Sequence, residues 1–372
     1  MKLLLLFFLL SIFYTPEGKV TNSISSPEQI KTAMAAHDRA IHVKDGWIRD
    51  PYIIQAPDGY FYLTGTTQSS SLVETPQTKY NIGLGDSSLV GSELQAWKTK
   101  DFIHWESFGI PYMLQDGIWA SAKPERFKAV PESQWRLWAP EFHFVNGKLV
   151  LIHTSPSPVA GANMSVSSGI EPKRPWANPM GEKIGKRHDP SLFQDEDGTW
   201  WMIWGATTIA PLKSDLSGFS GEEVNIGPSG ETSKMGHEGC LIRKIHGKYV
   251  LFGTGWSTGK MRKGSYNLYY ATADKITGPY SERKFVGRFL GHGTPFQNKD
   301  EKWWCTAFFN GNVPQVSKVG IQTKDLSGNA QTINEQGVTL VPLEVKMAGN
   351  ELIIRAIDPD YASPGPDELQ KF

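Results

Sequence analysis

Apolar and polar residues along this chain group into short runs that are typical of strands rather than helices. Between successive runs stand Asp-Gly, Asn-Gly or His-Gly pairs, whose glycines are Gly59, Gly147, Gly198 and Gly247. These residues tolerate the positive φ of tight turns, so each pair predicts a β-hairpin. Helical patterning is limited to residues 27–40, which we expect to pack on the outside. The pattern predicts an all-β protein.

One unit recurs along the chain: a small cluster with an acidic residue or proline, an apolar strand, a turn, and a second, aromatic-rich strand. Successive copies begin about 50 residues apart, except for a longer first gap that holds polar insertions at 68–92 and 112–134. A unit of this size with about four strands is a propeller blade, so we predict one five-bladed β-propeller over residues 23–372. The copies start at Asp50, Ala139, Asp189, Glu238 and, in a looser form, at His292-Gly293.

The first residues have the layout of a secretory signal peptide, because Met1 and Lys2 precede an apolar run over residues 3–14. This run is too short to span a bilayer. We expect residues 1–22 to be removed and the mature protein to be secreted or periplasmic. No later stretch resembles a membrane span.

Charge and cysteine content narrow the function further. Lysine plus arginine and aspartate plus glutamate both number 38, so no electrostatic footprint for nucleic acid or a membrane surface is present. The two cysteines, Cys240 and Cys305, lie in apolar runs and are expected to be buried free thiols.

Three carboxylates share one position in the repeat: Asp50, Asp189 and Glu238. The inner strand of each propeller blade lines the central channel, so residues at the same offset in different blades converge at one mouth. Clustered like charges destabilise a fold unless function or a cation requires them. A protonated carboxyl beside an ionised one suits acid and base catalysis on a glycosidic bond. A calcium-binding cluster is the chemical alternative.

Five short motifs stand in order along the chain: Arg49-Asp50-Pro51, Trp138-Ala139-Pro140-Glu141, His188-Asp189-Pro190-Ser191, His237-Glu238-Gly239 and Gly291-His292-Gly293. In this order they resemble the signature set of glycoside hydrolase family 43. The resemblance implies a five-bladed propeller, an inverting mechanism, Asp50 as general base, Glu238 as general acid and Asp189 as the residue that tunes and orients the acid. His292 matches a channel histidine that helps to hold a calcium or sodium ion in this family.

Two departures from the family pattern concern specificity. Cys240 stands where members usually have proline, and the only arginine after His292 is Arg355, although many members use a last-blade arginine to reach the substrate.

The inverting mechanism requires roughly 6.5–9.5 Å between the carboxyls of Asp50 and Glu238. Long insertions that narrow the channel mouth favour exo action.

Residues beside the acids and several aromatic residues are the predicted sugar contacts. We expect the aromatic side chains to provide a platform for the sugar ring. The predicted substrate-binding residues are Arg49, Trp119, Trp138, His188, His237 and Trp256.

Other functional interpretations are compatible with the sequence. In a neoagarobiose-hydrolase-like propeller a histidine donates the proton, and His237 next to Glu238 keeps that alternative alive. A non-catalytic carbohydrate-binding propeller and a protein-interaction propeller are the alternatives from other classes. The sequence does not distinguish arabinofuranose, xylose and galactose as the released sugar, and it predicts no oligomeric state.

Overall fold

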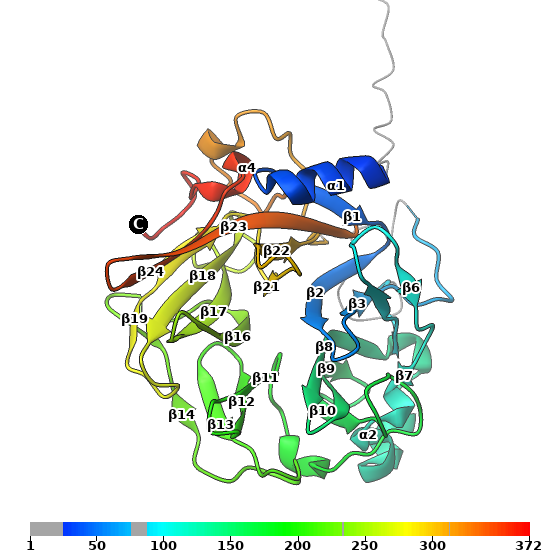
Figure 1. Ribbon diagram of the computed structural model, residues 1–372. Coiled ribbons are helices and arrows are strands. Elements are labelled where there is room, and N and C mark those ends of the chain that lie inside the picture. The colour runs from blue at the N-terminus through cyan, green and yellow to red at the C-terminus, as the bar shows by residue number, and fades with distance from the viewer. Residues whose placement is uncertain (1–24, 76–87, 233, 312) are drawn as a thin grey trace, which may run out of the picture.

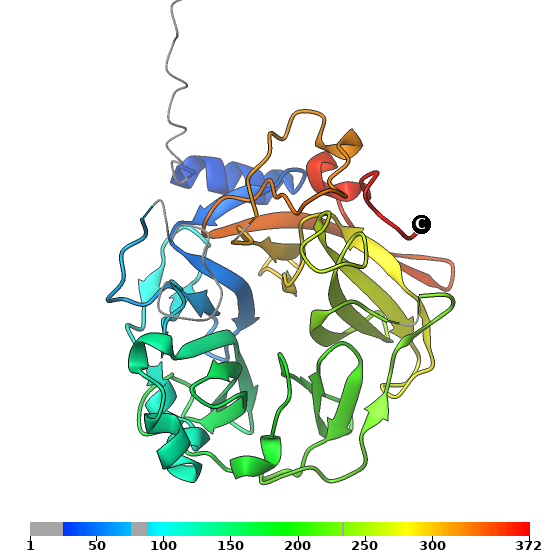
Figure 2. The same cartoon turned by 180° about the vertical axis from the view of Figure 1, so that it is seen from behind.

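The computed structural model describes residues 25–75, 88–232, 234–311 and 313–372. In these parts five blade sheets are arranged around a central axis, as Figure 1 and, from behind, Figure 2 show, and two further sheets are two-stranded pairs. The predicted all-β, five-bladed propeller is therefore confirmed. The predicted signal peptide lies outside the described residues.

The first four blades follow the order of the sequence, and in each the strands pair antiparallel from the channel outward. They consist of β2 (Ile48–Gln55), β3 (Phe61–Thr67), β5 (Trp97–Thr99) and β6 (Glu106–Ser107); β8 (Arg136–Val145), β9 (Lys148–Ser157) and β10 (Gly161–Val166); β11 (Ser191–Gln194), β12 (Trp200–Trp204), β13 (Thr208–Pro211) and β14 (Val224–Asn225); and β16 (Glu238–Ile245), β17 (Lys248–Trp256), β18 (Tyr266–Ala273) and β20 (Lys284–Gly287).

The fifth blade joins the two ends of the described chain. Its outermost strand comes from the N-terminal side and pairs antiparallel with β23, with Ile41 opposite Leu340. β24 extends the blade by pairing with the distal half of β23. The strands of this blade are β21 (Pro295–Gln297), β22 (Trp303–Ala307), β23 (Val338–Ala348), β24 (Glu351–Ala356) and β1 (Ile41–Lys44).

Helix α1 (Pro27–Ala36) lies on the outside of the ring against β1. The Ser26 hydroxyl accepts a hydrogen bond from the Gln29 amide at 3.2 Å, and the Gln29 side chain accepts one from the Ser26 amide at 2.7 Å. This capping box satisfies amides that the first turn leaves unpaired. The helix ends four residues earlier than predicted, because His37 adopts a left-handed conformation with φ 54°.

Several short elements were not predicted. The helices are too short to show a helical period, and the strands of the extra pairs have only two or three residues. The described residues contain no helix long and apolar enough to cross a bilayer. The additional elements are α2 (Ile118–Ala122), α3 (Pro124–Lys128) and α4 (Pro359–Ala362), the strand pairs β4 (Glu93–Leu94) with β7 (Tyr112–Met113) and β15 (Pro228–Ser229) with β19 (Tyr280–Glu282), and 3₁₀ turns at Leu114–Asp116, Glu132–Gln134, Gly181–Ile184 and Ile321–Thr323.

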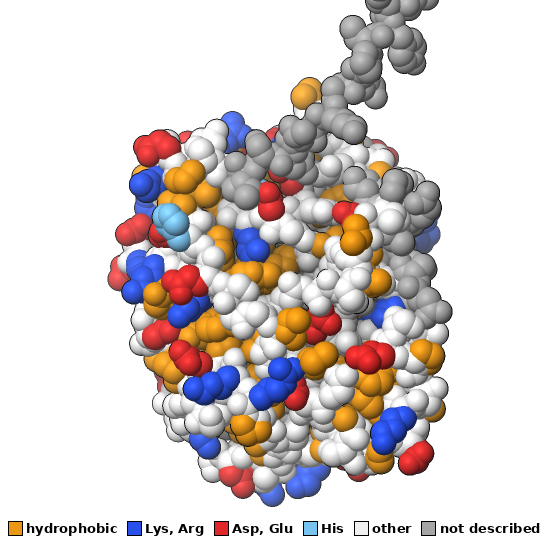
Figure 3. Space-filling view, turned by 90° about the vertical axis from the view of Figure 1, so that its right-hand side faces the viewer, with side chains coloured by type: hydrophobic (Ala, Val, Ile, Leu, Met, Phe, Trp, Pro, Cys, Tyr) orange, Lys and Arg blue, Asp and Glu red, His pale blue; other side chains and the backbone are white. Residues whose placement is uncertain are grey.

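The hydrophobic core consists of clusters between neighbouring blades. Leu63 from β3 packs with Trp304 from β22, and both are fully buried between blades 1 and 5. Cys240 and Cys305 are free and buried in two different clusters, as predicted. On the face seen in Figure 3, acidic and basic side chains are interspersed, in keeping with their equal numbers in the chain.

Candidate active site

The three predicted carboxylates Asp50, Asp189 and Glu238 line one cavity of about 330 Å³. They come from blades 1, 3 and 4, so residues far apart in the sequence meet because their blades begin alike. Six of the other predicted residues line the same cavity: Arg49, Trp138, His188, His237, Trp256 and His292.

The start of each inner strand has an unusual backbone conformation. The φ angles are 51° at Asp50, 43° at Ala139, 43° at Asp189 and 57° at His292, and Gly239 after Glu238 has φ 63°. Register shifts mark bulges at these points in β2, β8 and β16. Bulges re-aim side chains, and left-handed residues concentrate at functional sites. The shared repeat position is thus a shared backbone bend.

Gly239 is required where it stands. A Cβ atom at this position would lie 2.8 Å from the Cδ2 of His292, in addition to the strain of its positive φ. The proline that family members usually have one residue later is replaced by Cys240, whose thiol donates a hydrogen bond to the Ala206 carbonyl at 2.8 Å.

Threonines on the second strands fix the inner-strand starts across blade boundaries. The Thr66 hydroxyl donates to Asp50 Oδ2 at 2.8 Å and accepts the Ala139 amide at 2.8 Å. Thr154 accepts the Asp189 amide at 2.8 Å, and Thr254 accepts the His292 amide at 2.7 Å. Sequence reasoning missed these threonines. Thr66, Thr154 and Thr254 each follow a turn glycine by seven residues, a signal that was available.

Carboxylates and imidazoles alternate through the cavity. His292 Nδ1 lies 3.3 Å from Asp50 Oδ1, and its Nε2 lies 4.0 Å from Asp189 Oδ2. His188 Nε2 lies 3.3 Å from Asp189 Oδ2 and 3.1 Å from Glu238 Oε2. The sequence of groups places Asp50 and Glu238 at the two ends, with Asp189 between the two histidines. This order suits separate proton-transfer roles for Asp50 and Glu238, with Asp189 coupling the two histidines between them.

The electrostatics of Glu238 and His188 are linked. Burial raises the pKa of Glu238, but the hydrogen bond from His188, the charge of His292 and a 2.6 Å hydrogen bond from the Tyr266 hydroxyl together hold it below its usual range. The same hydrogen bond to Glu238 raises the pKa of His188 to about 9, despite its partial burial. In the free site the proton of this pair is therefore on His188.

The pKa of Asp189 shifts in the direction opposite to that of Glu238, whereas the pKa of His292 is raised like that of His188. Burial, helped by repulsion from Glu238 and Asp50, raises the pKa of Asp189 to about 6 against the attraction of both histidines. Burial lowers the pKa of His292, yet the surrounding carboxylates raise it above its ordinary value. His237 behaves differently, because its burial lowers its pKa and leaves the imidazole neutral.

These contacts bear on the predicted channel ion. Both nitrogens of His292 face carboxylates, an arrangement that fits an imidazolium ion pair. Among the described residues, the group whose ligand atoms lie close enough to share a cation is His188, Asp189 and Glu238. A channel ion and a metal role for His292 remain predictions, and we assign no step to an ion.

The three predicted tryptophans separate into two environments. Trp138 and Trp256 line the cavity, and the Trp256 ring lies 4.5 Å from the Tyr266 ring. The structure does not bring Trp119 to the cavity. Its side chain is buried in a cluster that includes Tyr112 and packs against Gly161 at the start of β10, because α2 folds the insertion back onto the outer strand of blade 2.

The structure adds four residues to the site: Met261, Arg262, Tyr266 and Asn310. Arg262 lies in the loop after β17 and lines the cavity from blade 4. Arg355 does not reach the cavity. It forms an ion pair with Glu344 at 2.6 Å on the outer part of blade 5.

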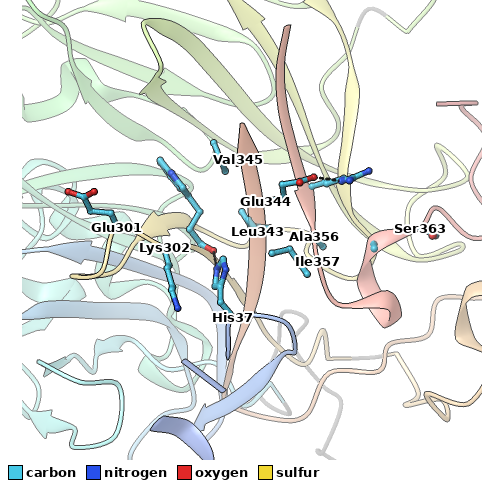
Figure 4. A pocket seen from close by; sticks show the side chains of 12 residues that line it. His37, Glu301, Lys302, Leu343, Glu344, Val345, Ala356, Ile357 and Ser363 are labelled. Atoms are coloured by element: carbon cyan, nitrogen blue, oxygen red, sulfur yellow. Dashed lines mark hydrogen bonds and ion pairs between the residues drawn. The ribbon is translucent and has the colours of Figure 1, made fainter. Parts of the chain in front are cut away.

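Figure 4 shows Glu344, close to Arg355, in another cavity, of about 650 Å³, which also contains His37 and Lys302. This cavity is larger than the carboxylate cavity. However, of its two carboxylates, Glu301 is exposed, and Glu344 is neutralised by Arg355 and by Lys346 at 2.6 Å. The convergent, partly buried acids therefore place the functional site at the smaller cavity.

A five-bladed propeller with three carboxylates at one channel mouth is the class of protein that this fold and site define. The profile described as Glycosyl hydrolases family 43 matches residues 42–324. The chain belongs to this family. That finding confirms the resemblance of the motifs.

Individual relatives are distant. The chain is 23% identical over 226 residues to the beta-D-galactofuranosidase xynD of Aspergillus niger, which covers 54% of this chain and 61% of that relative. The chain therefore spans less than two thirds of the length of this relative.

Solved structures share the fold. An endo-1,4-beta-xylanase from Bacteroides thetaiotaomicron has a TM-score of 0.56 and 18% identity, covering 86% of this chain and 97% of that one. An alpha-L-arabinofuranosidase from Clostridium thermocellum has a TM-score of 0.56 and 16% identity, covering 86% and 95%. The GH43 protein BlXynB from Bacillus licheniformis has a TM-score of 0.55 and 20% identity, covering 85% of this chain and 56% of that one.

Proposed function

We propose that the protein is an exo-acting, inverting glycoside hydrolase that releases a terminal sugar from a polysaccharide or oligosaccharide. The observation that carries the proposal is the alternating set of carboxylates and imidazoles, with Asp50 at one end and Glu238 at the other. Membership of the family supports the reaction class. The relatives' names support arabinofuranose, xylose or a galactose-type sugar as candidates for the sugar released.

In the proposed reaction Asp50 accepts a proton from a water molecule that attacks the anomeric carbon. Glu238 gives a proton to the departing glycosidic oxygen, so the bond breaks in a single displacement with inversion. The hydrogen bond from Thr66 and the contact with His292 hold the Asp50 carboxylate in place. The carboxyl separation expected for inversion, roughly 6.5–9.5 Å, remains a prediction.

Glu238 must be protonated before it can act as an acid, whereas in the free site the proton is on His188. A bound sugar expels water, and in a drier site a neutral pair is favoured over an ion pair. Binding therefore favours transfer of the proton from His188 Nε2 to Glu238 Oε2 across 3.1 Å. Asp189, 3.3 Å from the same nitrogen, keeps the imidazole oriented.

Exo action is supported by the size of the cavity. Its volume of about 330 Å³ is near the lower limit of typical ligand pockets, which fits one terminal sugar better than a chain that passes through. The insertion that contains α2 lies at the edge of blade 2 and does not form part of the cavity wall. This insertion therefore does not narrow the mouth, and part of the other predicted insertion, 68–92, lies outside the described residues.

A second candidate deserves comparison because a histidine contacts the acid. In a neoagarobiose-hydrolase-like reaction the proton donor is an imidazolium. His237 is neutral and does not suit that role, whereas His188 is protonated and lies in the cavity. Turnover that persists in a Glu238→Gln variant would favour the imidazolium donor, because the carboxyl acid is removed while Asp189 still lies 3.3 Å from His188.

The test is proton NMR analysis of the products from a polysaccharide and oligosaccharide panel. We expect a single released sugar whose first-formed anomer has the configuration opposite to the substrate. Glu238→Gln and Asp50→Asn should each lower kcat by roughly 10²- to 10⁴-fold with unchanged folding. Retained configuration would reject inversion. A lack of turnover combined with sugar binding would favour a non-catalytic carbohydrate-binding propeller.

A further inference from the structure

Two arginines from different blades line the candidate active site. Arg49 comes from β2 in blade 1, and Arg262 comes from the loop after β17 in blade 4. Arg49 donates to the Asn310 side-chain oxygen at 3.2 Å, and Arg262 donates to the Gly311 carbonyl at 3.1 Å. Adjacent residues of one segment after β22 thus hold both guanidinium groups at the cavity.

Neither arginine has a close carboxylate partner among the described residues. Arg262 forms no ion pair within 4 Å there, and the only carboxylate near Arg49 is Asp50 Oδ1 at 4.0 Å. That oxygen already lies 3.3 Å from His292, and the other oxygen of Asp50 accepts the Thr66 hydroxyl. The two histidines that contact these acids offset two of the three carboxylate charges in the cavity, so one of the two guanidinium charges is in excess.

Both guanidinium groups are partly withdrawn from water. The Arg49 side chain is 14% exposed, and its buried Nε–H has no hydrogen-bond partner. Burial and the nearby charge of Arg49 lower the pKa of Arg262 against the opposing attraction of Glu238, so the two cations repel each other across the site more than this carboxylate compensates. Desolvated charges without a partner destabilise a protein, so such a pair is expected where a ligand supplies the opposite charge.

We propose that Arg49 and Arg262 form an anion subsite, which binds the carboxylate or sulfate group of an acidic sugar. A guanidinium group presents paired N–H donors that match two oxygens of either anion. The substrate is then an anionic glycan, with the charged group on the sugar in the cavity or on the sugar attached to it. This inference rests on the proposed function, because it names the substrate class of the same site.

The subsite also accounts for a departure from the family pattern. Arg355 is the only arginine after His292, and it pairs with Glu344 away from the cavity. The cation that many members supply from the last blade is absent here, and Arg262 brings one from the blade before. A guanidinium group that enters from a different blade addresses a different part of the sugar, so the specificity is expected to differ as well.

The experiment compares native acidic polysaccharides, both uronic and sulfated, with their carboxyl-reduced and desulfated forms. We expect kcat/KM to fall roughly 10- to 100-fold when the recognised anion is removed, as expected for the loss of charge-assisted hydrogen bonds. A fall on carboxyl reduction identifies a uronic acid, and a fall on desulfation identifies a sulfate ester. Equal rates on the native and both neutralised forms would overturn the subsite and leave the proposed function intact.

Variants assign the effect to the residues. Arg262→Gln should lower kcat/KM on the native glycan more than on the neutralised glycan, mainly through KM, so the preference for the native glycan falls. Arg49→Gln should act in the same direction, and Arg355→Gln, an arginine outside the site, is the matched control with the wild-type preference. If Arg262→Gln weakens the action on native and neutralised glycans equally, the arginine does not bind an anion.

A binding measurement keeps the subsite separate from catalysis. Calorimetry on the Glu238→Gln variant with D-glucuronate, D-galacturonate, D-galactose 6-sulfate, D-glucose and D-galactose requires no turnover. Tighter binding of an acidic sugar than of its neutral counterpart, reduced by Arg262→Gln, supports the subsite even if no glycan is cleaved. Binding of the neutral sugars with equal affinity counts against it.

Discussion

The two ends of the inner strands differ sharply, although they belong to the same strands. At the starts, Asp50, Asp189 and His292 have left-handed backbones and face one cavity. Five residues later the same three strands end in neutral glutamines at the other end of the channel: Gln55, Gln194 and Gln297. The repeat places five equivalent positions in a ring at each end of the channel. Most ionisable groups lie at the end where the inner strands start and their backbone bends, which we call the bent end.

The difference teaches how the propeller separates stability from chemistry. The glutamine end is lined mainly by aromatic and aliphatic side chains such as Phe296 and Ile54, together with Arg243 and His143, and His143 pairs with Glu141 at 2.8 Å. Burial lowers the pKa of His143 there. At the bent end, bulges and cross-blade threonines hold charged groups in place. Charged catalytic groups require these bulges and hydrogen bonds to hold them in place, whereas apolar side chains at the glutamine end need only packing.

The largest expected effect contrasts two ends of one strand. Asp189→Asn should lower kcat by at least about 100-fold, because it removes the charge between His188 and His292. Gln194→Ala, at the far end of β11, should keep activity within about twofold of wild type. Initial rates and melting temperatures of both variants provide the check. Comparable losses in the two would contradict the division between the ends.

Two tryptophans sharpen the comparison between cavity and core. Trp119→Ala should lower the free energy of unfolding by about 3–5 kcal/mol, because its buried side chain fills the space between α2 and the outer strand of blade 2. Trp138→Ala should raise KM roughly fivefold to tenfold with a smaller loss of stability, because its ring lines the cavity. Denaturant unfolding and kinetics measure the two effects. A larger KM change for Trp119→Ala would place that residue at the site after all.

Removal of one threonine tests the supports directly. Thr154→Val leaves the buried Asp189 amide without its acceptor, and it should reduce stability by about 1–3 kcal/mol and also lower kcat. Thr154→Ser keeps the hydroxyl and should restore most of the activity. A Thr154→Val variant that loses stability but keeps the wild-type kcat would show that the threonine supports the fold only.

The smallest effect concerns pH. The pKa of His188 is raised from 6.5 to about 9 in the folded protein, so protonation of His188 stabilises the fold. This contribution is complete below pH 6.5 and is lost as the pH rises through about 9. The difference in melting temperature between wild type and His188→Gln should therefore shrink between these values. A difference that stays constant from pH 6 to 10 would argue against the ion pair with Glu238.

Much of the fold and site was accessible from the sequence because both follow one repeat. Turn glycines fixed where each hairpin reverses, and counting back from Gly198 or Gly247 located Asp189 and Glu238 at strand starts. The shared backbone bend turns that sequence offset into a spatial cluster. The family profile confirms the class that these motifs indicated.

Arg262 could not be found in this way, because contacts distant in the sequence shape its loop. Asp367 accepts hydrogen bonds from the Ser257 hydroxyl at 2.6 Å and the Ser265 amide at 2.9 Å, and the Leu369 amide donates to the Ser257 carbonyl. The C-terminal segment therefore holds both ends of the loop. No local pattern reports such contacts. Trp119 was misplaced for a related reason, because short helices direct its insertion inward.

The pairing of β1 with β23 has a consequence for how the protein folds during its synthesis. Ile41 and Leu340 are opposite each other, so the ring stays open until nearly all described residues have been synthesised. Early blades can collapse onto one another, but the seam closes last and over a long loop, which makes closure slow. Until then the edges of blades 1 and 5 are open to pairing with other chains. A cell that makes this protein has to shield those edges for the whole of translation.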